Sequence, residues 1–208
     1  MPPRYPVLLD MTGQPCLVVG GGAVAERKVL GLLGVEAIVT VIAPEVTDGL
    51  AAAVASGAGT VLWHQRRWAK EDLALQSWRF VVAATNDAAV NAVVRAEAAH
   101  QGLWANDVSA PDGGAAALPA VYRNGPVTIA VSTGGVHPGA AAWLRDLAAG
   151  VVAPEHLTAL DLVAEVRAAS PQASRPDWRQ AVDSGMLDLI REGRVAEAKE
   201  RLQACLSS

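Results

Sequence analysis

Three consecutive glycines, Gly20 to Gly22, follow the apolar run Cys16–Val19 and precede a stretch of helical composition, Ala23–Leu33. With Ala25 they complete the pattern G-x-G-x-x-A. In this pattern the first glycine permits a tight turn after a strand, the second lets the backbone approach a pyrophosphate, and the small last residue lets the helix pack closely on the sheet. The motif therefore predicts a strand–turn–helix unit that binds a dinucleotide. The alternative is a tight turn in an unrelated α/β protein.

Apolar runs alternate with helical patterns through the first half of the chain. The runs that predict strands are Cys16–Val19, Ile38–Ala43, Thr60–His64, Phe80–Ala84 and Leu103–Val108. Continuous apolar strands separated by helices are typical of a parallel sheet covered on both faces. We therefore expect an α/β fold. Thr60–His64 is the weakest run and is expected at an edge, and Tyr5–Leu9 is a candidate for one more strand.

The pattern changes near residue 109. The segment Ser109–Gly114 is rich in glycine and proline, which is the composition of a hinge. Two apolar runs, Leu118–Arg123 and Val127–Ser132, then flank Asn124-Gly125, a dipeptide that strongly favours a β-hairpin turn.

Helical composition dominates the rest of the chain. Pro138 can occupy the first turn of a helix that runs to about Ala149. From Pro154 onward the chain is expected to be helical, with breaks at Pro171, Pro176 and Gly193. We therefore expect three domains: an α/β domain in residues 1–112, a small hairpin-containing domain in 113–150 and a helical domain in 151–208.

Composition and charge exclude several classes of protein. Hydrophobic residues make up 51% of the 208 residues, which is enough for a packed core and excludes global disorder. A net charge of −4 argues against general binding to nucleic acid or to anionic membranes. The sequence shows neither a signal peptide nor an apolar run of membrane-spanning length, so we expect a cytoplasmic protein. The cysteines and histidines lack metal-ligand spacing, so no metal site is expected.

Further cofactor contacts are expected beyond the ends of the second and fourth strands. Glu45 is the nearest carboxylate to the position where a dinucleotide fold usually has its ribose-binding acid. The alternative is that Glu45 is a solvated helix-capping residue. No Arg follows this strand, which favours NAD over NADP. Thr85 and Asn86 follow the fourth strand and could contact cofactor, whereas Asp87 is better explained as the cap of the next helix.

Four stretches of the chain resemble a known family. They are YPVLLDMTGQPCLVVGGGAVAERKVLGLL, VTVIAPE, VVAATNDAAVN and LPAVYRNGPVTIAVSTGGVHPGAAAWLR. They are similar to precorrin-2 dehydrogenases, which also form the N-terminal part of siroheme synthases, in register from about Tyr5 to Ala149. The resemblance implies NAD-dependent oxidation of precorrin-2 to sirohydrochlorin, with ferrous iron insertion in some members. It also implies a Rossmann domain, a small dimerisation domain, a helical C-terminal domain and a homodimer.

The resemblance also implies particular site residues. It places cofactor contacts on Gly20, Gly21, Gly22, Ala23, Val24, Ala43, Pro44, Glu45, Thr85 and Asn86. It places a substrate-side serine at Ser132. The family usually has Asn-x-x-Asp after the fifth strand, with the Asp as acid–base, but here the stretch runs from Asn106 to Ser109. Ser109 therefore stands where the aspartate is expected.

Other polar residues are candidates for contact with the substrate or for proton transfer. A carboxylate-rich tetrapyrrole needs cationic partners, for which the candidates are Arg27, Lys28, Arg123 and Arg145; the alternative for each is a solvated surface charge. His137 lies before a helix and could accept a proton or ligate a metal, or it could be an ordinary loop histidine.

Asp107 is a candidate substitute for the missing aspartate. If the segment is extended, Asp107 and Ser109 point to the same face, and the carboxylate lies about 6–7 Å from the usual site. The alternative is that Asp107 caps a turn, and Asp112 is a further candidate. We therefore expect a dehydrogenase with weak or absent ferrochelatase activity. The alternatives are a non-catalytic NAD-binding module, a bifunctional dehydrogenase and ferrochelatase, and an enzyme for another tetrapyrrole.

Overall fold

The computed structural model describes residues 4–56, 60–110, 113–169 and 178–205. The chain divides into two compact units at the bond between Leu118 and Pro119. The expected break points Pro171 and Pro176, and the candidate Asp112, lie outside the described residues.

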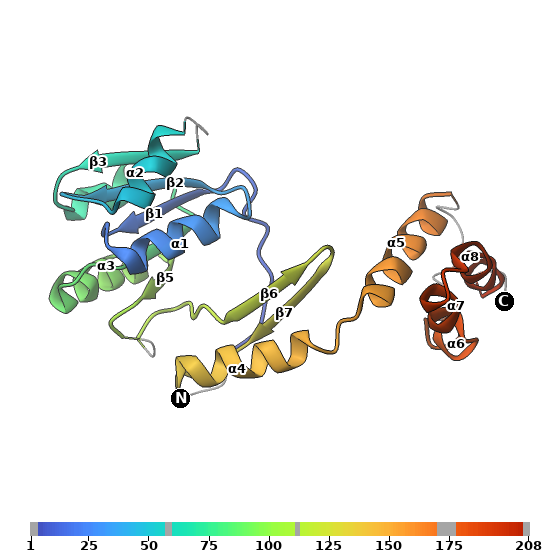
Figure 1. The fold of residues 1–208 in the computed structure, drawn as a ribbon. Coiled ribbons are helices and arrows are strands. Elements are labelled where there is room, and N and C mark those ends of the chain that lie inside the picture. The colour runs from blue at the N-terminus through green and yellow to red at the C-terminus, as the bar shows by residue number, and fades with distance from the viewer. Residues whose placement is uncertain (1–3, 57–59, 111–112, 170–177, 206–208) are drawn as a thin grey trace. The chain divides into compact units, whose positions relative to one another are not determined.

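The first unit contains a parallel five-stranded sheet (Figure 1). Its strands are β1 (Pro15–Val19), β2 (Ile38–Ala43), β3 (Val61–Gln65), β4 (Phe80–Ala83) and β5 (Trp104–Asp107). The strand order is β3-β2-β1-β4-β5, so the predicted parallel sheet is confirmed and β3 is an edge strand. The chain leaves β1 in one direction toward β3 and later returns beside β1 as β4. Such a reversal creates a crevice at the carboxyl ends of β1 and β4, where open α/β sheets bind ligands.

Helices cover both faces of this sheet. They are α1 (Ala23–Leu33), α2 (Asp48–Ala55), the 3₁₀ helix η1 (Lys70–Ala74) and α3 (Ala88–His100). Alternate residues of β1 face opposite sides: Cys16 and Val18 pack in a cluster with α1 and α2, whereas Leu17 and Val19 pack in a cluster with α3 and η1. The sheet is therefore doubly wound, as the continuous apolar strands predict.

The expected strand at Tyr5–Leu9 is wrong. These residues have no regular secondary structure, and Tyr5 and Leu8 are almost fully exposed. An apolar run becomes a strand only where a neighbouring strand supplies hydrogen bonds and its side chains find a core. The described part of the sheet ends on β3 and β5 and does not include this segment.

The second unit begins with the antiparallel hairpin β6 (Ala120–Asn124) and β7 (Val127–Val131). Asn124 pairs with Val127, so the turn residues are Gly125 and Pro126 rather than Asn124 and Gly125. Gly125 has a φ of 51°, which glycine adopts without steric cost. Helix α4 (Pro138–Ala149) packs against both strands of the hairpin.

The remaining helices build a core of their own. They are α5 (Pro154–Ala169), α6 (Trp178–Asp183), α7 (Met186–Arg191) and α8 (Val195–Ala204). Their buried side chains form one cluster that includes Leu162, Met186 and Leu202. Gly193 ends α7 with a φ of 76°, which agrees with the predicted break there.

The helices of the described segments include none that is by itself long and apolar enough to cross a membrane. Together α4 and α5 have sufficient length and apolar composition, but the pair is bent by 71°.

Candidate active site

The turn after β1 packs against the segments that follow β2 and β4. Gly20 has a φ of 121°, and a Cβ on it would lie 2.6 Å from the Ala84 carbonyl carbon and 2.9 Å from the Thr85 nitrogen. A Cβ on Gly21 would overlap the carbonyl oxygen of Glu45. Both positions therefore require glycine. Predicted cofactor residues from three separate loops lie together at the carboxyl edge of the sheet.

Gly22 borders open space at the N-terminus of α1. It is the N-cap of this helix, and a Cβ on it would meet no non-neighbouring atom within 4 Å. The Glu26 N–H donates to the Gly22 carbonyl at 2.9 Å, and the N–H groups of Ala23 and Val24 precede this first helical bond. Such first-turn N–H groups have no acceptor within the helix and favour an anion. The residues present therefore fit the pyrophosphate of a dinucleotide.

The segment after β2 is fixed to the glycine turn through Thr47. Its N–H donates to the Gly21 carbonyl at 3.0 Å, and its hydroxyl donates to Glu26 Oε2 at 2.5 Å. Thr47 is also the N-cap of α2, so the alternative that Glu45 caps this helix is wrong. The predicted cofactor residues here comprise one buried residue, Ala43, and two exposed ones, Pro44 and Glu45.

The segment after β4 is held by α3. The Oδ1 atom of Asp87 accepts from the Ala89 N–H at 2.9 Å, so the predicted capping role of Asp87 is confirmed. The side chain of Asn91 accepts a hydrogen bond from the Thr85 N–H and donates one to the Thr85 carbonyl. Asn86 is exposed at the same edge of the sheet.

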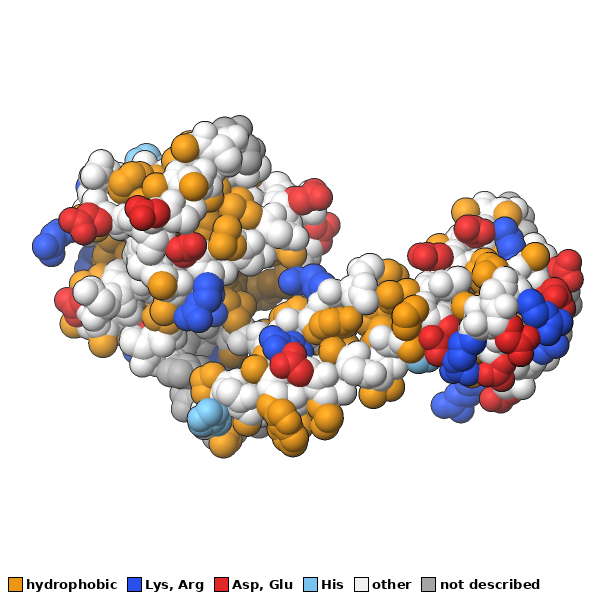
Figure 2. Space-filling model, in the orientation of Figure 1, with side chains coloured by type: hydrophobic (Ala, Val, Ile, Leu, Met, Phe, Trp, Pro, Cys, Tyr) orange, Lys and Arg blue, Asp and Glu red, His pale blue; other side chains and the backbone are white. Residues whose placement is uncertain are grey.

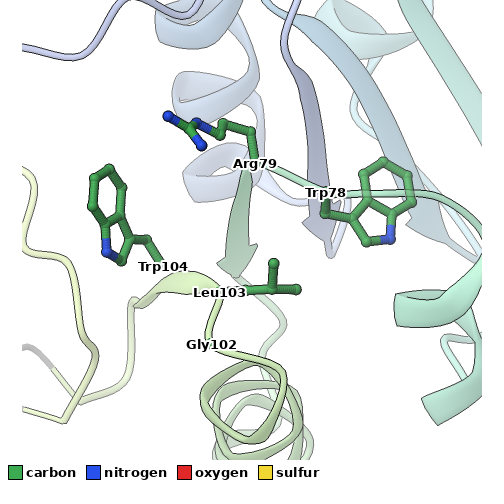
Figure 3. A pocket seen from close by; sticks show the side chains of 5 residues that line it. All are labelled: Trp78, Arg79, Gly102, Leu103 and Trp104. Atoms are coloured by element: carbon green, nitrogen blue, oxygen red, sulfur yellow. The ribbon is translucent and has the colours of Figure 1, made fainter.

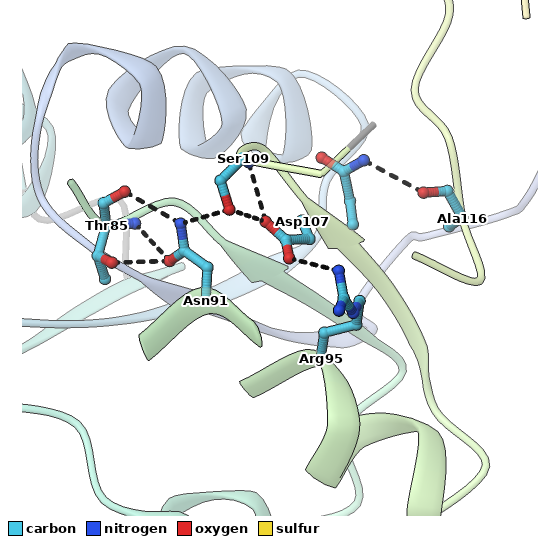
Figure 4. A network of polar contacts seen from close by, with 7 residues as sticks. Thr85, Asn91, Arg95, Asp107, Ser109 and Ala116 are labelled. Atoms are coloured by element: carbon cyan, nitrogen blue, oxygen red, sulfur yellow. Dashed lines mark hydrogen bonds and ion pairs between the residues drawn. The ribbon is translucent and has the colours of Figure 1, made fainter. Parts of the chain in front are cut away.

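A buried polar network lies beside this segment at the end of β5 (Figure 4). Asp107 is 1% exposed; its Oδ1 accepts from the Ser109 N–H at 2.9 Å and from the Ser109 hydroxyl at 2.6 Å. Its Oδ2 pairs with Arg95 Nη1 at 3.0 Å. The condition of an extended segment is not met, because the chain turns directly after Asp107 and brings Ser109 back onto its carboxylate. Asp107 therefore makes the contacts of a turn cap, which is the alternative noted above.

Asn106, the residue of β5 before Asp107, is also buried. Its Nδ2 donates to the Ala116 carbonyl at 3.2 Å, and the Ala116 N–H donates to the Ala105 carbonyl at 3.0 Å. Gly114 is also buried, and a Cβ on it would crowd the Ala105 carbonyl. Asn106 thus fixes the returning segment 113–116 to the edge of the sheet.

Three predicted site residues belong to the second unit, and all are exposed: Arg123, Ser132 and His137. His137 is the N-cap of α4, and its Nδ1 accepts from the Ala140 N–H at 3.3 Å. This bond requires an unprotonated Nδ1. The Ser132 hydroxyl oxygen accepts from the Gly134 N–H at 3.3 Å.

The other basic candidates have varied surroundings. Arg27 is exposed, while Arg145 pairs with Asp146 at 2.6 Å. Burial, followed by the charge of Arg27, lowers the pKa of Lys28. The described residues contain no cluster of three or more His, Cys, Asp or Glu side chains that could hold a metal ion.

Comparison with known proteins identifies the family of this fold. Residues 7–120 match the family model for NAD(P)-binding domains, and this range is more than half of the 208 residues. The chain belongs to this NAD(P)-binding family.

Proteins with similar sequences include siroheme synthases. The siroheme synthase of Methylococcus capsulatus is 36% identical over 203 residues, a match that covers 95% of this chain and 42% of the relative. That of Methylobacillus flagellatus is 32% identical over 208 residues, covering 97% and 44%. This chain therefore spans less than half the length of these relatives.

A solved structure of SirC, a precorrin-2 dehydrogenase, is similar over the whole chain. Its TM-score is 0.72 at 27% sequence identity, and the match covers 99% of this chain and 100% of the SirC chain. The resemblance inferred from the sequence motifs is thereby confirmed.

A shallow pocket of about 220 Å³ lies elsewhere on this NAD(P)-binding unit (Figure 3). It is lined by Trp78, Arg79, Gly102, Leu103 and Trp104, and the Arg79 guanidinium lies 5.9 Å from the centre of the Trp104 ring. These residues precede or begin β4 and β5, at the amino edge of the sheet. Because open parallel sheets bind ligands at the carboxyl edge, this pocket is separate from the cofactor crevice.

Sequence reasoning missed two residues of the polar network, Asn91 and Arg95. They lie four residues apart on α3, so they share one helix face. The signal was present in the sequence: both interrupt the otherwise apolar residues 88–96 of a helix that packs on the sheet through Val94 and Ala98. A polar residue on a buried helix face is an informative position.

Proposed function

We propose that this protein is an NAD-dependent dehydrogenase that oxidises precorrin-2 to sirohydrochlorin. The full-length similarity to SirC carries this proposal. The glycine turn, with its open space at the start of α1, and the similarity to siroheme synthases support it. We place the reaction in the cytoplasm, where the free cysteines Cys16 and Cys205 would stay reduced.

The reaction removes two hydrogens from the tetrapyrrole, one as a hydride and one as a proton. NAD, when bound, accepts the hydride. The chain binds and orients: the N–H groups at the start of α1 would hold the pyrophosphate, and Gly20 and Gly21 let the three loops meet there. The segment between Ala43 and Leu50 contains Glu45 and Asp48 but no Arg or Lys. Two carboxylates without a cation disfavour a 2′-phosphate, which supports NAD over NADP.

We assign the proton chemistry to Ser109 and His137, with Asp107 acting through Ser109. Asp107 is buried and already accepts three hydrogen bonds, two of them from Ser109. The Ser109 hydroxyl donates to Asp107 and accepts from Asn91, so its remaining lone pair can accept a hydrogen bond from the substrate. Asp107 is then a positioning residue rather than the displaced base considered from the sequence.

We assign substrate binding to Arg123 and Ser132 directly and to Asn106 indirectly. Arg123 and Ser132 are exposed and offer a guanidinium and a hydroxyl to the substrate carboxylates. Asn106 is buried and acts by fixing the segment at Ala116. Metal insertion needs a base for the pyrrole protons and a ligand for the ferrous ion, so a serine in place of an aspartate supports weak ferrochelatase activity.

We also propose that residues 113–150 form a dimerisation domain and 151–208 a separate helical domain. Figure 2 shows apolar side chains gathered along α4. Trp143 and Leu147 on α4 are 63% and 61% exposed, and Val136 before the helix is also exposed. An isolated hairpin with one helix buries little, so a second copy of the chain is the cover that fits this apolar surface.

The test is a turnover assay with purified protein, precorrin-2 and NAD. We expect sirohydrochlorin absorbance to appear together with NADH, and more slowly with NADP. Gly22→Asp should abolish turnover, because its carboxylate would meet the pyrophosphate. Absence of NADH formation by the unmodified protein would refute the proposed activity.

A non-catalytic NAD-binding module is the second candidate function, and Ser109 at the expected aspartate position favours it. The same assay separates the two. This candidate predicts NAD binding by calorimetry without any turnover of precorrin-2.

A further inference from the structure

Asn91 joins the two loops at the carboxyl edge of the sheet. It is fully buried in the first turns of α3, below the point where the chain leaves β4 and β5. Its Oδ1 accepts from the Thr85 N–H at 3.0 Å and from the Thr85 hydroxyl at 2.7 Å. Its Nδ2 donates to the Thr85 carbonyl at 3.1 Å and to the Ser109 hydroxyl oxygen at 3.3 Å.

These contacts use the full hydrogen-bonding capacity of an asparagine side chain. An amide has two donor hydrogens and two acceptor lone pairs, and Asn91 makes four such contacts. A buried amide is costly unless it is satisfied, and a satisfied one fixes the geometry of its partners. Asn91 therefore determines the position of Thr85 relative to Ser109.

Helix α3 holds Ser109 by a second route as well. Arg95, one turn after Asn91, pairs with Asp107, and Asp107 accepts from the Ser109 hydroxyl. Figure 4 shows these side chains converging from α3 and β5 on the same turn. The proton and one lone pair of the Ser109 hydroxyl are thus held by neighbours, because Asp107 accepts from it and Asn91 donates to it. One lone pair remains for the substrate.

We propose that Asn91 is a positioning residue that couples NAD binding at Thr85 to the placement of Ser109 toward the substrate. This inference rests on the proposed function. When the Asn91 amide is removed, the Thr85 segment loses three hydrogen bonds and Ser109 loses one. The two loops can then move independently, so both NAD affinity and the chemical step should suffer.

The experiment compares Asn91→Ala with Val94→Ala in the full chain. Val94 is also fully buried on α3, but it packs only in the apolar cluster on that face of the sheet. Both changes should lower Tm. Asn91→Ala should weaken NAD binding, measured by calorimetry, about tenfold or more, since a tenfold change corresponds to about 1.4 kcal/mol. Val94→Ala should leave the NAD dissociation constant unchanged.

Turnover at saturating NAD tests the coupling to Ser109. Asn91→Ala should lower kcat in the unmodified background and have a smaller effect in a Ser109→Ala background. A purely structural role would give the same factor in both backgrounds.

The outcomes separate this inference from the proposed function. If the unmodified protein binds NAD and turns over precorrin-2, but Asn91→Ala binds NAD normally or no worse than Val94→Ala, only the inference on Asn91 is overturned. If the unmodified protein binds no NAD, the proposed function fails and this inference fails with it. Additive effects of Asn91→Ala and Ser109→Ala on kcat would overturn the coupling.

Discussion

At the residue scale, the three glycines of the turn have different physical roles. Gly20 has a positive φ and lies against the Ala84 carbonyl, so a side chain there would be strained and overlapping. Gly21 lies against the Glu45 carbonyl, so a side chain there would also overlap backbone. Gly22 has an ordinary φ of −79° and faces open space, so its lack of a side chain serves a ligand rather than the fold.

This difference predicts that a substitution at Gly20 lowers stability, whereas a substitution at Gly22 lowers NAD binding. Gly20→Ala should lower the free energy of unfolding by about 1–3 kcal/mol, because of the strained backbone alone, and by more if the overlap cannot relax. Gly22→Asp should leave the urea midpoint nearly unchanged but abolish NAD binding in calorimetry. Gly22→Ala, which adds a methyl group without charge, is the control and should fold normally. Normal NAD affinity in Gly22→Asp would contradict the predicted role of the turn.

Ser109 is the residue at which the chain departs from the pattern that it otherwise resembles. Its hydroxyl is smaller than a carboxylate and carries no charge near neutral pH, so it can donate to Asp107 at 2.6 Å. An aspartate there would place two carboxylates side by side, which is unfavourable for both.

We therefore predict that Ser109→Asp increases metal insertion at a cost in stability. Ferrous iron insertion into sirohydrochlorin should be slow in the unmodified protein and rise at least about tenfold in Ser109→Asp, given that a general base contributes about 10²–10⁴-fold. Ser109→Asn has a similar shape without the charge and should not gain activity. Efficient iron insertion by the unmodified protein would show that Ser109 is no impairment.

At the scale of elements, the sequence predicts most strands and the main helices of the first unit. Apolar runs such as Ile38–Ala43 are decisive, because a strand buried on both faces is apolar at nearly every position. The run Tyr5–Leu9 has similar composition but is exposed, since strand formation depends on a partner strand that local sequence does not specify.

The cofactor crevice is also largely predictable, whereas the polar network is not. Gly20, Thr85 and Glu45 were expected there because parallel strands bring their carboxyl ends to one edge. The contacts of Asp107 with Arg95 and Ser109 depend on a turn after β5 and on the rotation of α3 about its axis. Neither can be inferred from a hydrophobic pattern, so the sequence leaves open whether this segment is extended or Asp107 caps a turn.

Asp72 shows how one carboxylate anchors a whole element. It joins the 3₁₀ helix η1 to the residue after β3: its oxygens accept from Arg66 at 2.6 and 2.8 Å, and also from the Ala69 N–H at 2.8 Å. The hydrogen bonds from Arg66 are the largest cause that lowers the pKa of Asp72. A carboxyl whose pKa is lowered in the folded state stabilises the fold above its unfolded pKa and loses this contribution as pH falls.

The unfolding free energy should therefore fall more steeply in the unmodified protein than in Asp72→Asn as pH decreases below about 4, near the pKa of an unfolded aspartate. At pH 7 the variant should be less stable by about 1–2 kcal/mol, because hydrogen bonds to a charged group are lost. Urea titrations followed by tryptophan fluorescence would measure both. Parallel pH profiles of the two proteins would exclude this contribution from Asp72.

At the scale of the whole molecule, the apolar clusters differ in how well they are covered. The two clusters of the parallel sheet and the cluster of α5–α8 are well buried, with members such as Leu17 and Leu202 fully enclosed. Within the hairpin and α4, by contrast, only Ala141 is buried in the described residues. A segment with so little core of its own is expected to gain stability from association.

This uneven coverage predicts that the protein is a dimer whose contact includes α4. Sedimentation of the unmodified protein at micromolar concentration should give twice the chain mass of 21.5 kDa. Trp143→Glu and Leu147→Glu place charges on exposed positions, so each chain should fold normally but dissociate, with the dimer dissociation constant raised about 100-fold or more. The reason is that burying one large apolar side chain contributes about 1.5–3 kcal/mol, and a charge at the same contact adds a further penalty.

Leu75→Glu, at a similarly exposed leucine near η1, is the matched control and should stay dimeric. A monomeric unmodified protein, or dimers that survive both α4 substitutions, would show that this surface is not the contact.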